Sequence, residues 1–306
     1  MQDIKDYIKK CRPSLSTSSV KTYASIIKNL YARVFEGPMD FSKFDDTDKV
    51  IHFLKDMPPN RRKTILSALV IVTDKKPYRD LMLEDVRAYN ADIHKQEKTP
   101  EQQASWVDTN QVQDTFNELK SNAELLYKKK NLTHADLQSI QSFIIIACLG
   151  GIFIPPRRSK DYVDFVIRDV DKSKDNYLDK NKMIFNSFKT AKTYGQQVVD
   201  VPPPLKKILT KWISVNPTND LLFDSNMNKL SSVKLNQRLN KIFDKKVGVN
   251  QLRHTYLTGK YASTIKQNED IANTMTEMGS SSQQLSGFFP LFSFFPFFPL
   301  LKRYII

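Results

Sequence analysis

The sequence of 306 residues contains only two cysteines, Cys11 and Cys148, which lie far apart. No disulfide framework is therefore indicated, and Cys148, inside the apolar run 143–149, is expected to behave as a small buried hydrophobe. Residues 1–12 alternate in charge and lack the apolar core of a secretory signal. These absences predict an intracellular protein of the cytoplasm or nucleus that is not secreted.

Acidic residues are also in deficit, since 33 Asp and Glu face 47 Lys and Arg and leave a formal net charge of +14. A charge of this size predicts a polyanionic partner. Charge alone does not distinguish DNA, RNA and an acidic membrane, and nucleic acid is the favoured interpretation. The remaining composition is that of a globular protein long enough for two domains.

The first part of the chain, residues 1–96, is predicted to be an all-helical domain. Apolar residues at helical spacing indicate a helix from Ser16, a second helix capped by Asp46 or Thr47, a third after Pro58-Pro59 and a fourth over 78–95. Arg61, Arg62 and Lys63 open the third helix. Two interpretations of this cluster remain open, a DNA contact and a solvated helix end.

Residues 97–108 are polar and are predicted to be a linker to a second domain at 109–287. Helices are expected over 110–129 and 135–149, the latter ended by Gly150-Gly151, and further amphipathic helices are expected after Pro202. The segments 164–170, 182–188 and 196–201 are expected to form a small antiparallel sheet. The predicted fold class is therefore mainly α with a small antiparallel β-sheet.

Three basic segments occur in the second domain in the order Arg157-Arg158, Lys189 and Arg253-His254. An arginine fork binds phosphate oxygens in pairs, and a lysine acts as a point charge or as an acid. Two guanidinium groups and one ammonium group brought together would suit a phosphodiester.

In the order and spacing of these segments the sequence resembles the tyrosine recombinase (phage integrase) family. The resemblance extends to about Leu285. It implies a helical core-binding (SAM-like) domain followed by a DNA breaking-rejoining catalytic domain, with double-stranded DNA as partner and self-association on DNA. It also implies a viral or mobile-element gene and an activity that needs no metal and no nucleotide cofactor. No membrane partner is expected.

Within this resemblance Arg158 matches the first-box arginine, because family members place an acidic residue three positions later, as Asp161 does here. Arg157 is then expected to be an outward phosphate contact or a surface charge. Lys189 occupies the place of the hairpin lysine that protonates the leaving 5′ oxygen. Lys192 is the alternative for that role, or a further DNA contact.

Arg253 matches the second-box arginine, and His254 follows it as in many family members. His254 is either a DNA contact or a buried structural histidine. Asn250 stands three residues before Arg253, where the family has histidine or lysine. Asn250 can form hydrogen bonds but cannot titrate, so the change affects proton transfer more than phosphate binding.

The C-terminal end departs from the family pattern. Ser280 replaces a histidine, and Phe289 stands where the nucleophilic tyrosine is expected. Tyr304, the only tyrosine after Gly279, is the remaining candidate nucleophile.

Residues 288–306 are predicted to be a low-complexity apolar tail, and positions 288–301 contain only Phe, Pro, Leu and Ser. Because pyrimidines alone can encode these four residues, a frameshift or truncation is the favoured explanation. A membrane anchor is the alternative, but the run is shorter than about 20 residues and contains prolines.

Three functions remain open. The first is a site-specific recombinase or integrase by descent, impaired by loss of its tyrosine. The second is a DNA-binding protein that keeps the fold without cutting. The third, a basic RNA-binding or scaffold protein, is weakest, because no aromatic RNA-binding box is evident and the ordered Arg158, Lys189 and Arg253 would be unexplained.

Overall fold

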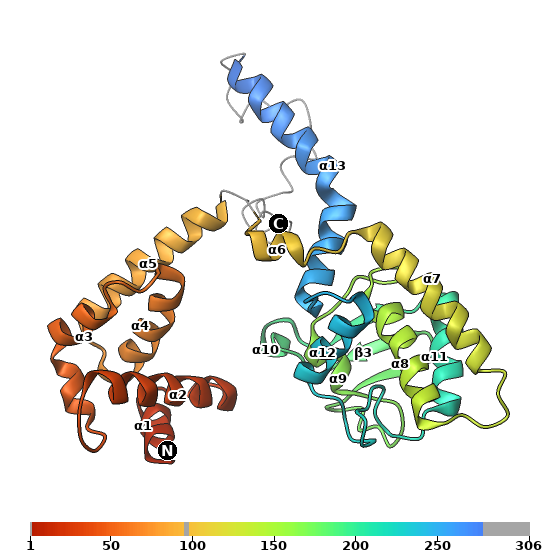
Figure 1. Ribbon diagram of the computed structural model, residues 1–306, viewed down its shortest axis with the longest axis horizontal. Helices are drawn as coiled ribbons and strands as arrows, with labels where there is room; N and C mark the ends of the chain where they lie inside the picture. The colour runs from red at the N-terminus through yellow and green to blue at the C-terminus, as the bar shows by residue number, and fades with distance from the viewer. Residues whose placement is uncertain (1, 95–97, 278–306) are drawn as a thin grey trace. The chain divides into compact units, whose positions relative to one another are not determined.

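The computed structural model describes residues 2–94 and 98–277 (Figure 1). The chain divides into two compact units, Met1–Glu97 and Lys98–Ile306, and each is described by itself. Ser280, Phe289, Tyr304 and the apolar tail lie outside the described residues, so the predictions for them remain predictions.

The described part of the first unit is helical throughout. Its elements are α1 (Gln2–Cys11), α2 (Thr17–Val34), the 3-10 helix η1 (Phe41–Asp45), α3 (Thr47–Leu54), α4 (Pro59–Thr73) and α5 (Lys76–His94). Side-chain caps explain two of the helix starts: the Ser16 oxygen accepts a hydrogen bond from the backbone N–H of Ser19, and Asp46 accepts one from Lys49. Pro59 opens α4, where a missing N–H costs nothing.

A single apolar core holds the first unit together. Its fully buried side chains include Ile27, Phe44, Leu54 and Leu69. Tyr78 is also fully buried and donates its hydroxyl to the carbonyl of Phe44, with an O···O distance of 2.7 Å. The helices predicted from Ser16, Asp46, Pro58 and Tyr78 all occur, whereas α1 and η1 were not predicted.

The second unit combines helices with one small sheet. Its helices are α6 (Pro100–Ala104), α7 (Thr109–Leu126), α8 (His134–Leu149), α9 (Ser159–Val163), α10 (Ala191–Tyr194), α11 (Pro203–Val215), α12 (Ser232–Phe243) and α13 (Val249–Glu277). Helix α6 lies in the range predicted as a linker and begins with a capping box between Thr99 and Gln102.

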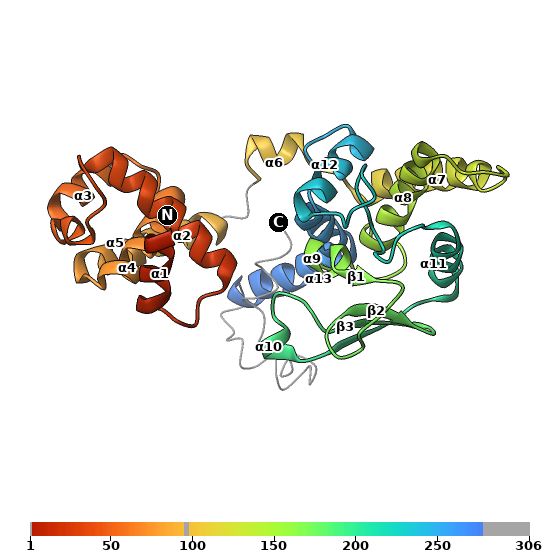
Figure 2. The same ribbon diagram turned by 90° about the horizontal axis from the view of Figure 1, so that it is seen from below.

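The sheet has four strands in the order β1 (Phe165–Val166), β2 (Asn176–Asp179), β3 (Lys182–Phe185) and β4 (Gln197–Asp200). β2, β3 and β4 pair antiparallel, as expected of a hairpin meander, and β1 pairs with β2 in parallel. β2 was not predicted, because its sequence Asn-Tyr-Leu-Asp is bracketed by charged residues. Figure 2 shows β2 and β3 on one side of this unit and α8 and α12 on the other.

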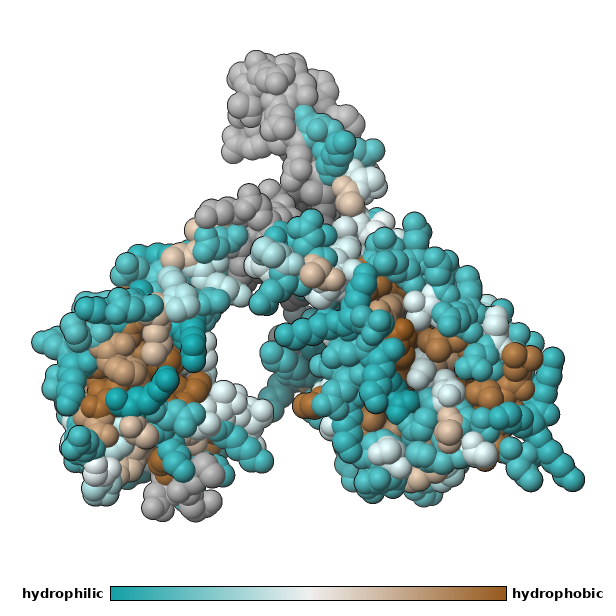
Figure 3. Space-filling view, in the orientation of Figure 1, coloured by the Kyte–Doolittle hydropathy of each residue, from teal (hydrophilic) through white to brown (hydrophobic). Residues whose placement is uncertain are grey.

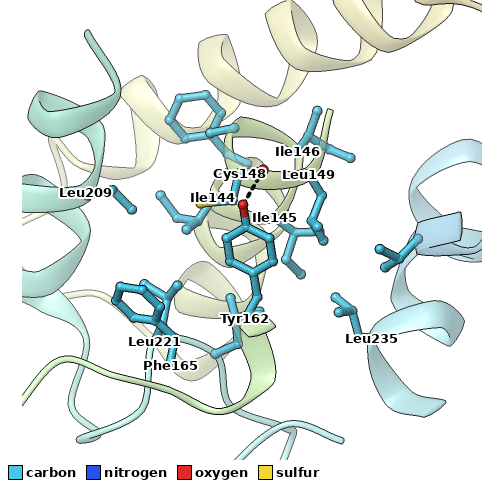
Figure 4. Close-up of a cluster of buried hydrophobic side chains, with 14 of the residues drawn as sticks. Ile144, Ile145, Ile146, Cys148, Leu149, Tyr162, Phe165, Leu209, Leu221 and Leu235 are labelled. Carbon is cyan, nitrogen blue, oxygen red and sulfur yellow. Dashed lines mark hydrogen bonds between the residues drawn. The ribbon is translucent and has the colours of Figure 1, made fainter. Parts of the chain in front are cut away.

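Helix α8 lies at the centre of the second core. Ile144, Ile145 and Leu149 are fully buried, and Cys148 is buried beside them as predicted. Burial raises the pKa of the Cys148 thiol to about 12, so it remains a neutral apolar group. Tyr162 of α9 points into this cluster and donates its hydroxyl to the Cys148 carbonyl at 3.0 Å (Figure 4).

The fold is therefore mainly α with one small sheet, which confirms the predicted fold class. Hydrophilic side chains cover most of the visible face of each unit (Figure 3). Within residues 2–94 and 98–277, none of the helices combines the length and the apolar character needed to span a bilayer.

Candidate functional site

A pocket of about 490 Å³ in the second unit brings two of the three predicted basic segments together. Arg157 and Arg158 line it from the turn before α9, and Arg253 lines it from α13. The other lining residues come from that same turn and from the β3–β4 region: Pro155, Pro156, Asp161, Phe188, Thr190, Tyr194, Gln197, Val198 and Val199.

The turn that carries the two arginines has little freedom. Pro155 and Pro156 fix their own φ angles and restrict the residues before them, and Pro156 is buried. Arg158 is the N-cap of α9, with an extended backbone. Because Tyr162 anchors the short helix to α8, the backbone at Arg158 is held from both sides.

Arg157 differs from the exposed charge that was predicted. Its Nε donates to Asp161 Oδ2 at 2.9 Å, and its guanidinium carbon lies 4.1 Å from the centre of the Phe185 ring. The side chains of this pair are only 19% and 2% exposed. Arg157 lies four residues before Asp161, and from there its side chain, rather than that of Arg158, contacts the Asp161 carboxylate. Burial raises the pKa of Asp161, and the Arg157 charge opposes that rise.

Arg158 keeps its side chain available to a ligand. It lines the pocket, and among residues 2–94 and 98–277 its guanidinium forms no hydrogen bond or ion pair. The spacing to Asp161 favoured Arg158 as the phosphate-binding arginine. In the structure Arg157 forms the ion pair with Asp161. The Arg158 guanidinium therefore has no ion-pair partner among the described residues.

Arg253 is positioned by the first turns of α13. Leu252 and Thr255, its neighbours on the buried side, are 1% and 3% exposed, and the Thr255 hydroxyl donates to the Val107 carbonyl at 2.5 Å. Arg253 Nη1 donates to Asn250 Oδ1 at 3.4 Å, so these two residues, three positions apart, share a helical face. Asn250 is exposed, and His254 is half-buried.

Gly151 allows the two arginine segments to approach each other. Its φ of +75° lies in the left-handed region, and a Cβ atom there would lie 2.5 Å from Tyr256 Cδ2. Only a glycine permits this contact between the segment after α8 and the helix that carries Arg253.

Lys189 is not among the residues that line the pocket, although its neighbours Phe188 and Thr190 are. It is exposed and, within the described part of the chain, makes no hydrogen bond or ion pair. Lys192, in α10, is exposed as well. The pocket therefore contains Arg158 and Arg253, and the convergence of Lys189 with them is a proposal.

Sequence analysis missed Tyr194 as a site residue. This side chain lines the pocket from α10 and is 66% exposed. Its sequence signal is the glycine that follows it, which is typical of a turn. Gly195 does adopt a φ of +65°, and it ends α10.

Among the described residues, the pocket is lined by three guanidinium groups, those of Arg157, Arg158 and Arg253, by the hydroxyl of Tyr194 and by one acidic group, Asp161, which is paired with Arg157. Such a site suits an anion with several oxygens. Among the described residues, no group of three or more His, Cys, Asp or Glu side chains is arranged to hold a metal ion.

Solved structures that resemble this chain include those of a recombinase and of an integrase. The first is the crystal structure of XerA recombinase, with 13% identity, coverage of 100% of this chain and 93% of that chain, and a TM-score of 0.36. A lambda integrase tetramer bound to a Holliday junction matches at 12% identity, 85% and 70% coverage and a TM-score of 0.40. A lambda integrase(75-356) dimer bound to a COC′ core site matches at 12% identity, 94% coverage of both chains and a TM-score of 0.42.

XerA and lambda integrase are tyrosine recombinases. No protein-family model matches the sequence, and a comparison with curated proteins also finds no match.

The basic cluster of the first unit contains residues with different surroundings. Arg62 forms a bidentate ion pair with Asp85, through Nε to Oδ2 at 2.9 Å and Nη2 to Oδ1 at 2.7 Å. The pKa of Arg62 is raised, and the hydrogen bond to Asp85 is the largest cause. Lys63 lies over the ring of Tyr89, and burial lowers its pKa. Arg61 is exposed.

Arg61 lines a groove of about 680 Å³ between α2 and α4, together with Arg33. Neither arginine forms a hydrogen bond or ion pair with any residue the structure describes. Arg61 is therefore the member of the cluster best placed for a phosphate contact, whereas Arg62 holds α4 against α5.

Arg62→Ala is expected to lower the free energy of unfolding of the first unit by about 3 kcal/mol, because it leaves a buried carboxylate without its partner. Asp85 is 1% exposed. Hydrogen exchange of the α4 and α5 amides in the full chain measures the effect. Arg61→Ala is the control, with an expected change within about 0.5 kcal/mol. Equal effects of the two variants would contradict a structural role for Arg62.

Proposed function

We propose that this protein is a tyrosine recombinase by descent that binds double-stranded DNA and engages one phosphodiester with Arg158 and Arg253. The observation that carries the proposal is the presence of both arginines in one pocket, although they lie on segments far apart in the sequence. A phosphodiester has two non-bridging oxygens, and two guanidinium forks can each hold one of them. Lys189 would stand beside them at the leaving oxygen.

In the active form of this chemistry the arginines stabilise the negative charge that develops on the phosphorus oxygens. A tyrosine hydroxyl gives its proton to a base and attacks phosphorus, the bond to the 5′ oxygen breaks, and that oxygen takes a proton from a nearby acid. Here Phe289 replaces the attacking tyrosine and Ser280 the histidine. Binding is proposed to persist and cleavage to be impaired.

A second candidate function, DNA binding without cleavage as the protein's purpose, is favoured by the same Phe289. Both functions require phosphate contacts, and they differ in covalent chemistry. The two units would contribute separately, with the second unit at the phosphodiester and the first unit along the flanking duplex.

Affinity for a duplex of mixed sequence is expected to fall steeply as salt rises, because bound cations release condensed counterions. Replacing Arg61 and Lys63 together by alanine should reduce the slope of log affinity against log salt by about two. Fluorescence anisotropy at several salt concentrations gives the slope. The matched control replaces Lys10 and Arg12, which are exposed on and just after α1. An unchanged slope in the Arg61 and Lys63 variant would show that the first unit does not contact phosphates there.

A further inference from the structure

Asn176, at the start of β2, is fully buried, with 0% of its surface exposed. Its side-chain Nδ2 donates to the carbonyl of Asp161 at 3.0 Å and to that of Ser187 at 2.9 Å. Its Oδ1 accepts from the backbone N–H of Asn186 at 2.9 Å and from that of Ser187 at 2.8 Å. An asparagine amide has two N–H donors and two acceptor lone pairs, so its hydrogen-bonding capacity is used completely.

The partners of Asn176 belong to two segments that carry proposed site residues. Asp161 lies in α9, which begins directly after Arg158. Asn186 and Ser187 follow β3 and directly precede Phe188, Lys189 and Thr190. One buried side chain therefore joins the backbone three residues after Arg158 to the backbone two and three residues before Lys189.

The side-chain amide of Asn186 also forms hydrogen bonds that hold the segment carrying Lys189. Asn186 Nδ2 donates to the carbonyls of Lys172 at 3.0 Å and Asp175 at 2.9 Å, and its Oδ1 accepts from Gln196 Nε2 at 2.8 Å. Positions 186 and 196 are the two ends of the connection between β3 and β4. The connection is thus tied to itself at its ends and to α9 through Asn176.

Lys189 needs such support more than the arginines do. Arg158 is fixed by the prolines and by Tyr162, and Arg253 by a long helix. Within the described residues the Lys189 side chain is exposed and forms no hydrogen bond, ion pair or ring contact, so its position depends on the backbone of this connection. A fully satisfied buried amide network specifies one backbone arrangement, because breaking any of its bonds leaves a desolvated polar group unpaired.

We propose that Asn176 is a positioning residue that sets Lys189 against the phosphate held by Arg158 and Arg253, with the Asn186–Gln196 bond completing the arrangement. This inference rests on the proposed function. The inference goes beyond the proposed function because it assigns a role in the site to a buried amide that contacts neither DNA nor the reacting atoms.

The test is a double-mutant cycle on affinity for a short duplex, measured with the full chain. Lys189→Ala is expected to weaken binding about tenfold in the unaltered background, as the loss of one close phosphate contact. In the Asn176→Asp background the same change should cost less than twofold. Asn176→Asp keeps the shape of the side chain and the Oδ1 atom that accepts two hydrogen bonds. It replaces the Nδ2 donor with a second carboxylate oxygen, which would face the carbonyls of Asp161 and Ser187. The repulsion is expected to displace the connection between β3 and β4.

Two controls separate positioning from general destabilisation. Arg253→Ala should cost the same in both backgrounds, because α13 does not contact Asn176 by any of its hydrogen bonds. Gln196→Ala, at an exposed position that is easily tolerated by the fold, should also reduce the Lys189→Ala penalty, to less than half its fold-change. This variant decides the matter if Asn176→Asp does not fold.

Additive cycles in Asn176→Asp or in Gln196→Ala would overturn the positioning role. No effect of Lys189→Ala in the unaltered protein would overturn it as well, because Lys189 would then not reach the phosphate. The proposed function would survive either result as long as Arg253→Ala weakened binding. It would fail by itself if Arg253→Ala had no effect.

Discussion

No covalent protein–DNA adduct is expected when the unaltered protein is incubated with a nicked duplex that traps the 3′-phosphotyrosyl intermediate. Formation of that intermediate needs an oxygen nucleophile, and the phenylalanine at position 289 has none. Arg158, Lys189 and Arg253 are proposed to bind the phosphate, but none of them supplies an oxygen nucleophile. The readout is a band of reduced mobility on a denaturing gel.

Phe289→Tyr is the gain-of-function arm of this experiment. An adduct that forms only in Phe289→Tyr would support a recombinase that has lost its nucleophile. Two further variants test the other available hydroxyls: Tyr304→Phe, for the only tyrosine after Gly279, and Tyr194→Phe, for the tyrosine that lines the arginine pocket.

An adduct formed by the unaltered protein would contradict the prediction. Its loss in Tyr304→Phe or in Tyr194→Phe would then identify the nucleophile. Loss in Tyr194→Phe would place the reacting oxygen in the same pocket as Arg158 and Arg253. Sequencing the gene downstream in its other reading frames complements this experiment, because a frame encoding a tyrosine in a short helix would identify the original ending.

The second large effect is expected for the pair of pocket arginines. Replacing Arg158 and Arg253 together by alanine should weaken duplex binding at least a hundredfold. A hydrogen bond to a charged group contributes about 1.5–3 kcal/mol, and each arginine is proposed to make at least one. Titration of the duplex with each variant at a fixed salt concentration measures the loss.

A charge-matched control separates a specific site from a general field. Lys128 and Lys130 are exposed after α7 and do not line the arginine pocket. Their double replacement removes the same formal charge and is expected to weaken binding less than tenfold. If both double variants lost affinity equally, the protein would bind DNA through its net charge of +14 rather than through the pocket.

Arg157 and Arg158 differ in their surroundings, although they lie in the same turn. The sequence presented Arg157 and Arg158 as adjacent and chemically identical groups, and spacing to Asp161 favoured Arg158. The structure gives the carboxylate to Arg157 and leaves Arg158 with no ion pair among the described residues. Adjacent side chains leave the backbone in different directions, so their partners follow from the path of the turn, which sequence spacing does not specify.

The sequence by itself determined the longer helices after Ser16 and the order of the basic segments. Helices α2, α7, α11 and α12 follow from apolar residues at helical spacing, because that period records directly which side of a helix is buried, whereas α8 follows from its apolar run over 143–149. The spacing of Asn250 and Arg253 on one helical face could also be predicted, since it needs only the local geometry of a helix.

Only the tertiary structure decided which charges are available and what holds them. Arg62 looked like its neighbours Arg61 and Lys63 until α5 brought Asp85 against it. β2 and the buried Asn176 gave no periodic signal, because a four-residue strand that begins with Asn and ends with Asp among charged residues resembles a loop until its hydrogen-bond partners are present. Pairing between groups distant in sequence depends on how the elements pack. A one-dimensional pattern therefore records the burial of a residue but not the identity of its partner.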